Sequence, residues 1–172
     1  HDVAIVPQEG FLFTSTLADN LRYGEPEADT AQVETAATQA RLADDIKSFP
    51  DGYETIVGER GITLSGGQRQ RTALGRALLV DAPVLVLDDA LASVDNNTAA
   101  AILDSIPAQD GRTIVMISHQ LSAAAACDRI LVMDNGQIVQ QGHHNQLIQV
   151  AGVYRRLWER EQAVEGLDAV AS

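Results

Sequence analysis

The stretch Leu64-Ser65-Gly66-Gly67-Gln68, followed by the apolar run Val84 to Leu87 with Asp88-Asp89 at its end and then by Ala92-Ser93-Val94-Asp95, decides the fold of this chain. Ser65 can cap a helix that begins in the glycine pair, because a serine oxygen accepts hydrogen bonds from N–H groups of the first turn. The free N–H groups and the positive end of such a helix attract an anion such as a phosphate, and two glycines let the backbone approach it closely. The stretch therefore predicts nucleotide chemistry.

The composition is that of one globular domain. The chain has 172 residues, of which 45% are hydrophobic and 21% charged, so it can build a core and is too apolar for a disordered chain. The formal net charge of −12 disfavours a nucleic-acid partner, because phosphate backbones are bound by basic surfaces. The single Cys127 excludes an internal disulfide framework and is expected to be a buried apolar residue of a cytoplasmic protein. No apolar run approaches the roughly 20 residues of a membrane-spanning helix.

Short apolar runs alternate with helical stretches along the chain. The runs are expected to be parallel strands covered on both faces, and they are Val3 to Val6, Val84 to Leu87, Thr113 to Ile117 and Ile130 to Met133. Helices are expected at Thr30 to Ser48 with Asp29 or Thr30 as cap, at Gly67 to about Val80, and at Asn96 to Ser105. This alternation indicates an α/β layer architecture.

The segment between the first two predicted strands has a different character. We expect residues 9–80 to form a helical insertion without a strand. Near the end, Asp134-Asn135-Gly136-Gln137 predicts a hairpin turn, and a terminal helix is expected from about Val153 to Ala163. The expected organisation is a first core strand and its following loop (1–8), a helical subdomain (9–80), a core (81–165) and a frayed tail (166–172).

The order of these motifs resembles the nucleotide-binding domain of an ABC transporter of the exporter type, of which the chain would be the C-terminal two-thirds. The resemblance implies an α/β fold, a partial P-loop NTPase (RecA-like) parallel sheet with an inserted helical subdomain. It also implies an ATPase motor in which two such domains sandwich two ATP molecules with Mg²⁺. Each ATP is bound by the phosphate loop of one domain and the Leu-Ser-Gly-Gly-Gln motif of the other, at the cytoplasmic face of the cell (inner) membrane.

Three residues would then act on the nucleotide held by this chain. Gln8 resembles the Q-loop glutamine, whose amide contacts Mg²⁺ or the attacking water. Asp88 resembles the Walker B aspartate that holds Mg²⁺, since a hard cation needs an oxygen anion fixed at a strand end. His119 resembles the switch histidine that contacts the γ-phosphate and orients the water.

Other residues would act across the interface with the second domain. By the same resemblance, Ser65, Gly66, Gly67 and Gln68 would bind the γ-phosphate of an ATP held by the partner, supplying fixed dipoles where charge shifts during transfer. Asp95 resembles the D-loop aspartate that couples the two ATP sites, although a turn or helix-cap role for it stays open.

Two further segments select the exporter type. Thr55 to Gly61 looks like the X-loop of exporter domains, and Leu17 to Gly24 resembles the segment that follows their Q-loop. The resemblance implies that Glu59 and the region around Phe11 to Phe13 meet the coupling helices of a transmembrane domain. Ordinary packing of these apolar side chains is the alternative.

The phosphate-binding loop is the first departure from the family pattern. The motif G-x-x-x-x-G-K-[ST] needs glycines at positions 41 and 46 before Lys47-Ser48, where this chain has Arg41 and Ile46. We therefore expect a fragment that lacks the Walker A segment and, by itself, binds ATP poorly and is inactive. The missing strand would leave a gap in the sheet, to be filled by a longer native chain or by dimerisation or strand exchange.

The second departure is Asp89, which stands where the family has a catalytic glutamate. Its carboxylate is one methylene short, so the resemblance implies a degenerate ATP site of the kind found in heterodimeric exporters. A heterodimer is thus favoured over a homodimer, although the retained His119 is compatible with residual hydrolysis.

Two other functions remain open. One is a truncated, non-catalytic module that only dimerises or docks on a membrane subunit. The other is a soluble ABC-type ATPase of DNA maintenance, which the acidic charge and the absence of long heptads oppose. Selectivity for a transported substrate belongs to the membrane helices in this family, so residues 1–172 carry no signal for it.

Overall fold

The computed structural model describes residues 2–58, 61–106 and 111–170, with the side chains of 96, 97 and 164–170 left aside. The chain forms two compact units, residues 1–118 and residues 119–172, and each unit is described by itself. In the part of the chain that is described, no helix is both long and apolar enough to cross a bilayer.

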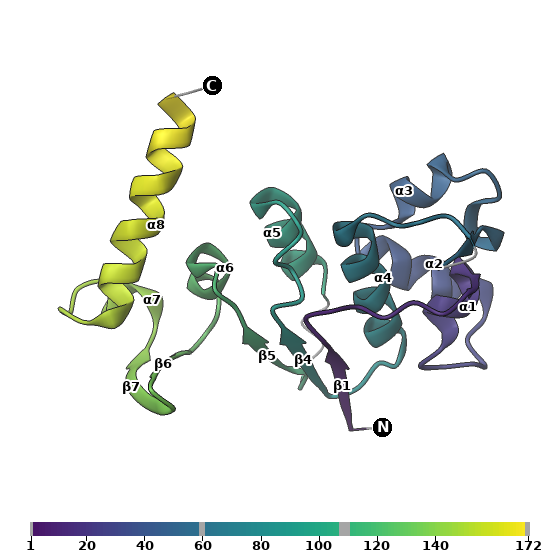
Figure 1. The fold of residues 1–172 in the computed structure, drawn as a ribbon. Helices are drawn as coiled ribbons and strands as arrows, with labels where there is room; N and C mark the ends of the chain where they lie inside the picture. Colours follow the sequence, from purple (N-terminus) through teal and green to yellow (C-terminus); the bar gives the residue numbers. More distant parts are fainter. Residues whose placement is uncertain (1, 59–60, 107–110, 171–172) are drawn as a thin grey trace. The chain divides into compact units, whose positions relative to one another are not determined.

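A three-stranded parallel sheet is the centre of the first unit. It consists of β1 (Val3–Val6), β4 (Val84–Asp88) and β5 (Thr113–Ile117), in the order β1-β4-β5. Val6 pairs with Leu87 and Asp88 pairs with Ile117, so the strands end at one edge of the sheet (Figure 1). These three strands were predicted as parallel, and the structure confirms them.

One face of this sheet is covered by α4 (Gly66–Leu79) and α5 (Asn96–Ser105). Leu85 and Leu87 of the middle strand are buried in one apolar cluster with Leu74 of α4 and Ile102 of α5. Burying such side chains contributes roughly 1.5–3 kcal/mol each, which fixes the two helices on the sheet.

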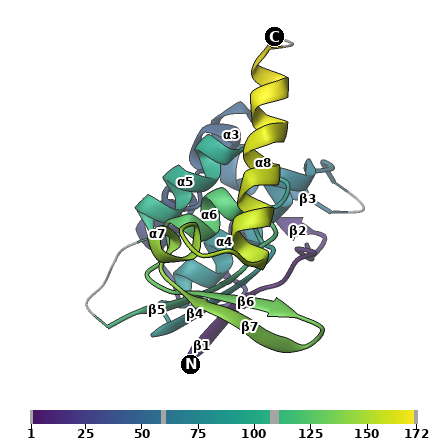
Figure 2. The ribbon, with the colours of Figure 1, turned by 90° about the vertical axis from the view of Figure 1, so that its left-hand side faces the viewer.

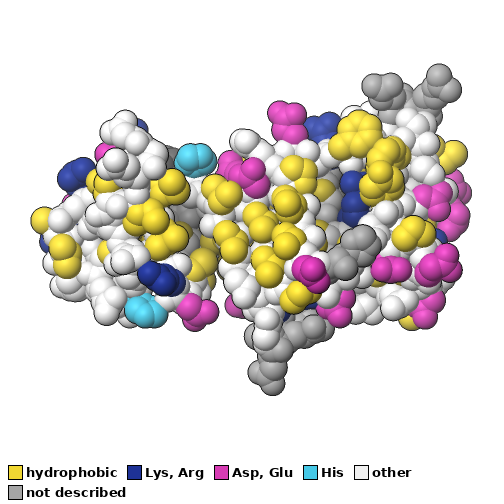
Figure 3. Space-filling model, turned by 90° about the horizontal axis from the view of Figure 1, so that it is seen from below, with side chains coloured by type: hydrophobic (Ala, Val, Ile, Leu, Met, Phe, Trp, Pro, Cys, Tyr) yellow, Lys and Arg dark blue, Asp and Glu magenta, His cyan; other side chains and the backbone are white. Residues whose placement is uncertain are grey.

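The opposite face of the sheet is uncovered. Figure 3 shows hydrophobic side chains gathered there, and the exposed ones include Val3, Ile5, Val115 and Ile117, with Ile5 exposed to 62%. The expectation of two covered faces is therefore wrong within the first unit, because its described residues supply helices to one face only. Within the same residues, β5 has a strand partner on one edge only.

A second apolar cluster lies in the helical part of the first unit. Its helices are α1 (Leu17–Arg22), α2 (Thr30–Gln39) and α3 (Ala43–Ser48), followed by the 3₁₀ turn η1 (Gly52–Glu54). The single helix expected from 30 to 48 is broken, since Arg41 has a left-handed backbone with φ of 54°. The break lets Leu42 and Ile46 enter the cluster. Helix propensity alone did not predict the break, because tertiary packing overrides propensity here.

The same region contains two strands of two residues each. β2 (Ser15–Thr16) and β3 (Ile56–Val57) pair antiparallel, so the expectation that residues 9–80 hold no strand is wrong. A two-residue ladder is too short to produce the alternation by which strands are recognised. Glu59, expected at a membrane-domain contact, lies outside the described residues.

Helix starts follow the sequence closely. The Asp29 carboxylate accepts a hydrogen bond from the N–H of Gln32 at 2.8 Å, and the Gln32 side chain accepts from the N–H of Asp29. The Asp95 carboxylate accepts from the N–H of Thr98 at 3.0 Å at the start of α5. In each cap, a nearby side chain accepts a hydrogen bond from an N–H group of the first helical turn. Because the partners are only three residues apart, such caps can be predicted from the sequence.

The second unit is a hairpin with helices. Its elements are α6 (Leu121–Ala125), β6 (Ile130–Asp134), β7 (Gln137–Gly142), α7 (His144–Leu147) and α8 (Val153–Val170) (Figure 2). The hairpin turn is confirmed, with Asn135 and Gly136 at φ of 47° and 77°. The run Ile130 to Met133 is antiparallel to β7, so its expected place among parallel strands is wrong. α8 continues past Ala163 into the segment expected to fray, and residues 171–172 lie outside the described part.

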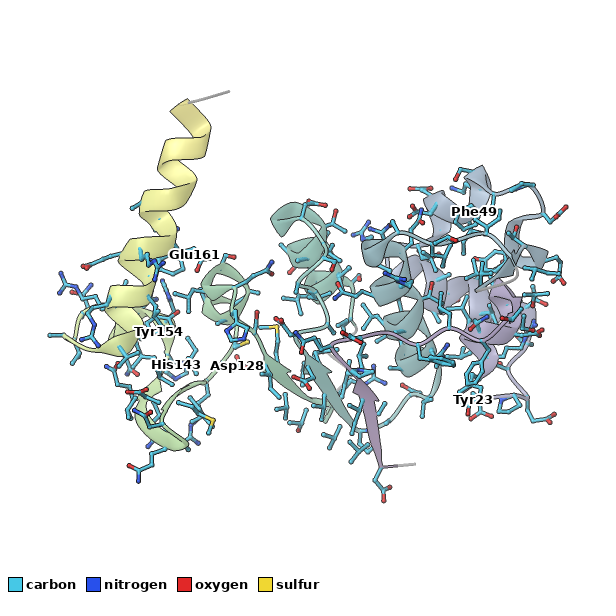
Figure 4. The ribbon with its side chains drawn as sticks, in the orientation of Figure 1. Tyr23, Phe49, Asp128, His143, Tyr154 and Glu161 are labelled. Atoms are coloured by element: carbon cyan, nitrogen blue, oxygen red, sulfur yellow. The ribbon has the colours of Figure 1, made fainter. Side chains whose placement is uncertain are left out.

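Side chains of α8 hold the second unit together. Tyr154 is only 1% exposed, and its hydroxyl shares a hydrogen bond of 2.8 Å with Nδ1 of His144. Burial raises the pKa of Tyr154. Glu161 accepts hydrogen bonds from the N–H groups of Leu121 and Ser122 at 2.9 and 3.3 Å, joining α8 to α6 (Figure 4).

Candidate functional site

Two predicted site residues leave the sheet of the first unit at the same edge. Gln8 follows β1 by two residues, and Asp88 is the last residue of β4. Because Val6 and Leu87 are register partners, both chains emerge at the carboxyl end of parallel strands, where α/β sheets bind ligands. Asp89 comes next, and the structure thus brings Gln8, Asp88 and Asp89 to one edge.

Asp89 has an unusual backbone. Its φ is 47°, in the left-handed region, and its N–H donates to the carbonyl oxygen of Ile117 at 2.9 Å. Asp and Asn tolerate this region better than most residues with a Cβ, and such conformations cluster at functional sites. His119, two residues after Ile117, is the first residue of the second unit.

The predicted phosphate-binding turn is the start of α4. Ser65 is its N-cap: the Ser65 Oγ accepts from the N–H of Gln68 at 3.2 Å, and Gln68 Oε1 accepts from the N–H of Ser65 at 2.9 Å. The N–H groups of Gly66 and Gly67 lie in the first turn, where an α-helix provides no acceptor for them. The cap is confirmed, and the turn has the donors that an anion requires.

The glycines of this turn lie against the loop that leads to Asp95. A Cβ on Gly67 would lie 3.0 Å from the backbone oxygen of Ser93, and one on Gly66 would lie 3.5 Å from the Ser93 side chain. A larger side chain at position 67 would displace this loop. The structure therefore groups the turn with the loop before Asp95.

Asp45 of α3 is a residue of this site that sequence reasoning missed. It accepts hydrogen bonds from Gln68 Nε2 at 2.8 Å and from Arg71 Nη2 at 2.7 Å. Because Gln68 also accepts from Ser65, the Asp45 carboxylate holds the glutamine that closes the cap. No local signal marks Asp45, since its partners lie 23 and 26 residues away.

An Asp45→Ala exchange is expected to lower the free energy of unfolding by about 1–3 kcal/mol, because it leaves the mostly buried Arg71 guanidinium without its carboxylate. The neighbouring Asp44→Ala is the matched control, since the Asp44 pair with Lys47 is almost fully exposed. Urea unfolding of the complete domain measures both variants. Equal effects of the two exchanges would contradict the anchoring role of Asp45.

An exposed aromatic cluster lies elsewhere on the first unit. We name Phe11, Phe13 and Tyr23 the aromatic surface: Phe13 contacts the Phe11 ring edge-on at 5.0 Å and stacks on Tyr23 at 4.4 Å between centroids. Phe11 and Tyr23 are 65% and 61% exposed. Tyr23, marked in Figure 4, was not singled out from the sequence, although it lies within the segment Leu17 to Gly24.

Arg76 of α4 lies against two rings of the aromatic surface. Its guanidinium lies 5.4 Å from the Tyr23 ring centroid and 5.8 Å from that of Phe13. It also donates to the carbonyl oxygens of Asn20 and Phe11 at 2.8 and 3.2 Å. Burial lowers the pKa of Arg76. An exposed apolar patch of this kind is a candidate contact surface.

The donor set fits ATP and Mg²⁺ in part. Asp88 and Gln8 offer the hard oxygen atoms that Mg²⁺ uses together with phosphates, and the α4 turn offers N–H groups for a phosphate. Lys47 and Ser48 do not form a phosphate loop, since they lie in the last turn of α3 and Lys47 pairs with Asp44 at 2.7 Å.

Comparisons with known proteins agree with this geometry. A family model described as ABC transporter matches residues 1–92. The chain is 44% identical over 167 residues to the multidrug resistance-like ATP-binding protein MdlA of Escherichia coli, covering 96% of this chain and 28% of that protein. It is 44% identical over 160 residues to the ATP-dependent lipid A-core flippase of Saccharophagus degradans, covering 92% of this chain and 27% of that protein.

A solved structure gives the same result for the fold. The structure of a bacterial Atm1-family ABC exporter with ATP bound superposes with a TM-score of 0.88 at 42% identity, covering 93% of this chain and 28% of that one. This likeness confirms the α/β fold of the P-loop NTPase type. The chain spans less than a third of the length of these relatives.

Proposed function

This chain belongs to the ABC transporter family, and from that premise we propose that it is part of the ATP-driven motor domain of an exporter. The observation that carries the proposal is the α4 turn, where the capped Ser65 and the N–H groups of Gly66 and Gly67 form an anion site. We propose that this turn binds the γ-phosphate of an ATP held by a second nucleotide-binding domain.

The residues at the sheet edge serve this chain's own ATP site in the proposal. The chemistry that bound ATP and Mg²⁺ supply is phosphoryl transfer to water. With ATP and Mg²⁺ bound, Asp88 and Gln8 would hold the cation, Asp89 would accept a proton from the attacking water, and His119 would orient that water. Asp95 caps α5 in this structure, and its role across the dimer is part of the proposal.

We further infer that this ATP site is degenerate, because Asp89 is shorter than the glutamate it replaces. A dimer with one degenerate ATP site can still hydrolyse ATP if its second site is complete. The proposal is therefore a heterodimer in which this chain completes its partner's site through Ser65, Gly66, Gly67 and Gln68.

The aromatic surface is proposed to meet the coupling helices of the transmembrane domain. Its rings are exposed, apolar and rigidly supported by Arg76, as expected of a side that is covered in an assembly. Such a contact places the domain at the cytoplasmic face of the membrane. We also propose that other residues of the whole protein cover the exposed sheet face that contains Ile5. Residues 9–80 are proposed to be the helical subdomain, and residues 81–165 the core.

ATP hydrolysis by the full-length protein in lipid vesicles tests this function. We expect hydrolysis that requires Mg²⁺. Tyr23→Asp is expected to retain ATP binding and lose the membrane-domain contact, measured as cross-linking to the coupling helices, because it puts a carboxylate into an apolar interface. Tyr23→Phe, which keeps the ring, is the control.

A non-catalytic docking module is the second candidate, favoured by one observation: residues 1–172 contain no phosphate-loop motif. A full-length protein that docks through the aromatic surface yet binds no ATP would establish this candidate and refute the motor proposal.

A further inference from the structure

Gln70, in the second turn of α4, is a buried amide between two loops of the site. It is 7% exposed. Its Oε1 accepts from the N–H of Ser93 at 2.9 Å, and its Nε2 donates to the carbonyl oxygen of Gln8 at 3.5 Å, a longer and weaker bond. Only a side chain that carries both an acceptor and a donor can make both contacts.

The packing around Gln70 connects α4 to the same two loops. A Cβ on Gly10 would lie 3.1 Å from the backbone oxygen of Arg69 and 3.1 Å from the Cβ of Ala73, so the segment after Gln8 lies directly on α4. On the other side, the first turn of α4 lies against Ser93. Helix α4 thus packs closely against both loops, and a large shift of either loop would disturb this packing.

The two loops have different tasks in the proposed function. The segment Gln8 to Phe13 runs from the sheet edge with the proposed Mg²⁺ site to the aromatic surface. The loop Ala92 to Asp95 ends at Asp95, which is proposed to act across the dimer. The sequence offers no sign of a link between them, because Gln70 lies 62 residues from Gln8 and 23 residues from Ser93.

We propose that Gln70 is a positioning residue that sets the loop 92–95 relative to the segment 8–13, so that a shift imposed at the aromatic surface reaches Asp95 in the same chain. This inference rests on the proposed function and adds the connection between its two surfaces. The Gln70 side chain acts through the backbone groups of Ser93 and Gln8.

Two variants of the full-length protein separate the two contacts. Gln70→Ala removes both, whereas Gln70→Glu keeps an oxygen acceptor for the N–H of Ser93 and places a second oxygen towards the carbonyl of Gln8. Arg69→Ala is the matched control, an exposed neighbour on the same helix. Residue-resolved hydrogen exchange measures the protection of the amides in the two loops, and steady-state kinetics measure kcat and KM for ATP.

For Gln70→Ala we expect exchange of the Ser93 amide to accelerate about tenfold, as for the loss of one hydrogen bond. The kcat for ATP should fall while KM stays unchanged, and exchange in α5 should stay as in the wild type. For Gln70→Glu the Ser93 amide should keep its protection, while amides in 9–13 exchange faster and kcat falls. Arg69→Ala should change none of these quantities.

Unchanged exchange at Ser93 in Gln70→Ala, or equal acceleration throughout the first unit, would overturn the positioning role. If Gln70→Ala does not fold, Gln70→Glu decides, and wild-type exchange over 9–13 together with wild-type kcat would overturn it. A wild-type protein without ATPase activity would refute the proposed function alone, because the exchange measurement still tests the link.

Discussion

Replacing Ser65 by arginine is expected to reduce ATP hydrolysis of the assembled dimer by about 10²–10³-fold, the loss seen when a fixed donor to a developing anion is removed. The arginine removes the oxygen that accepts from the N–H of Gln68 and puts a long side chain where the γ-phosphate of the partner's ATP would bind. Steady-state ATPase activity of the full-length protein with its partner measures the loss.

Two companion variants show which property of Ser65 matters. Ser65→Asp keeps an N-cap acceptor, so the protein should stay as stable as the wild type, yet its charge repels a phosphate and hydrolysis should still fall. Thr63→Arg adds the same cation two residues earlier, at an exposed position, and should leave activity unchanged. Full activity of Ser65→Asp would show that the turn does not meet a phosphate.

In a heterodimer, the ATP site that loses turnover in Ser65→Arg shows which chain holds the nucleotide that Ser65 contacts. Ser65→Arg should stop turnover at the partner's complete site and leave nucleotide binding at this chain's own site intact. Trapping of a labelled nucleotide on each of the two chains distinguishes the sites. Loss of binding on this chain alone would contradict action across the interface.

Asp89→Glu is expected to raise hydrolysis at this chain's own ATP site by at least about tenfold, up to the 10²–10⁴-fold that a general base contributes. The added methylene brings the carboxylate closer to a water at the γ-phosphate. Glutamate tolerates the left-handed backbone of position 89 less well than aspartate, so a small loss of stability should accompany the gain. Trapping of a labelled nucleotide on this chain measures the change at its own site, and the melting temperature of the full-length protein measures the loss of stability.

Asp89→Asn is the control for this exchange. Asparagine accepts the same backbone conformation and lacks the carboxylate, so this chain's site should show only background hydrolysis and unchanged stability. An unchanged rate in Asp89→Glu would mean that the shorter carboxylate already suffices, and the degenerate site would have to be given up.

Features governed by nearby residues could be predicted from the sequence. Asp29 and Ser65 begin their helices as expected, because each cap is made by groups three residues apart. The turn at Asn135-Gly136 was predictable for the same reason, since a positive φ at adjacent residues favours this pair. The position of Asp88 at the end of β4 follows from the apolar run before it.

Features governed by tertiary packing could not be predicted. The left-handed Arg41 breaks a stretch with good helical propensity because Leu42 and Ile46 gain burial in a cluster built by other segments. The apolar runs 3–6 and 113–117 predict cover on both faces of the sheet, whereas the described residues of the first unit cover one face. An apolar pattern predicts that a side chain is buried, but it does not predict which segment covers that side chain.

The sequence by itself determined the motifs, their order and the ends of the elements that bear them, because caps, turns and strand ends depend on residues a few positions apart. Only the tertiary structure decided that Asp45 holds Gln68, that Arg76 supports Tyr23 and that Gln70 joins Gln8 to Ser93. These contacts join residues 23 to 62 positions apart, and their distances exist only once the helices have packed on the sheet.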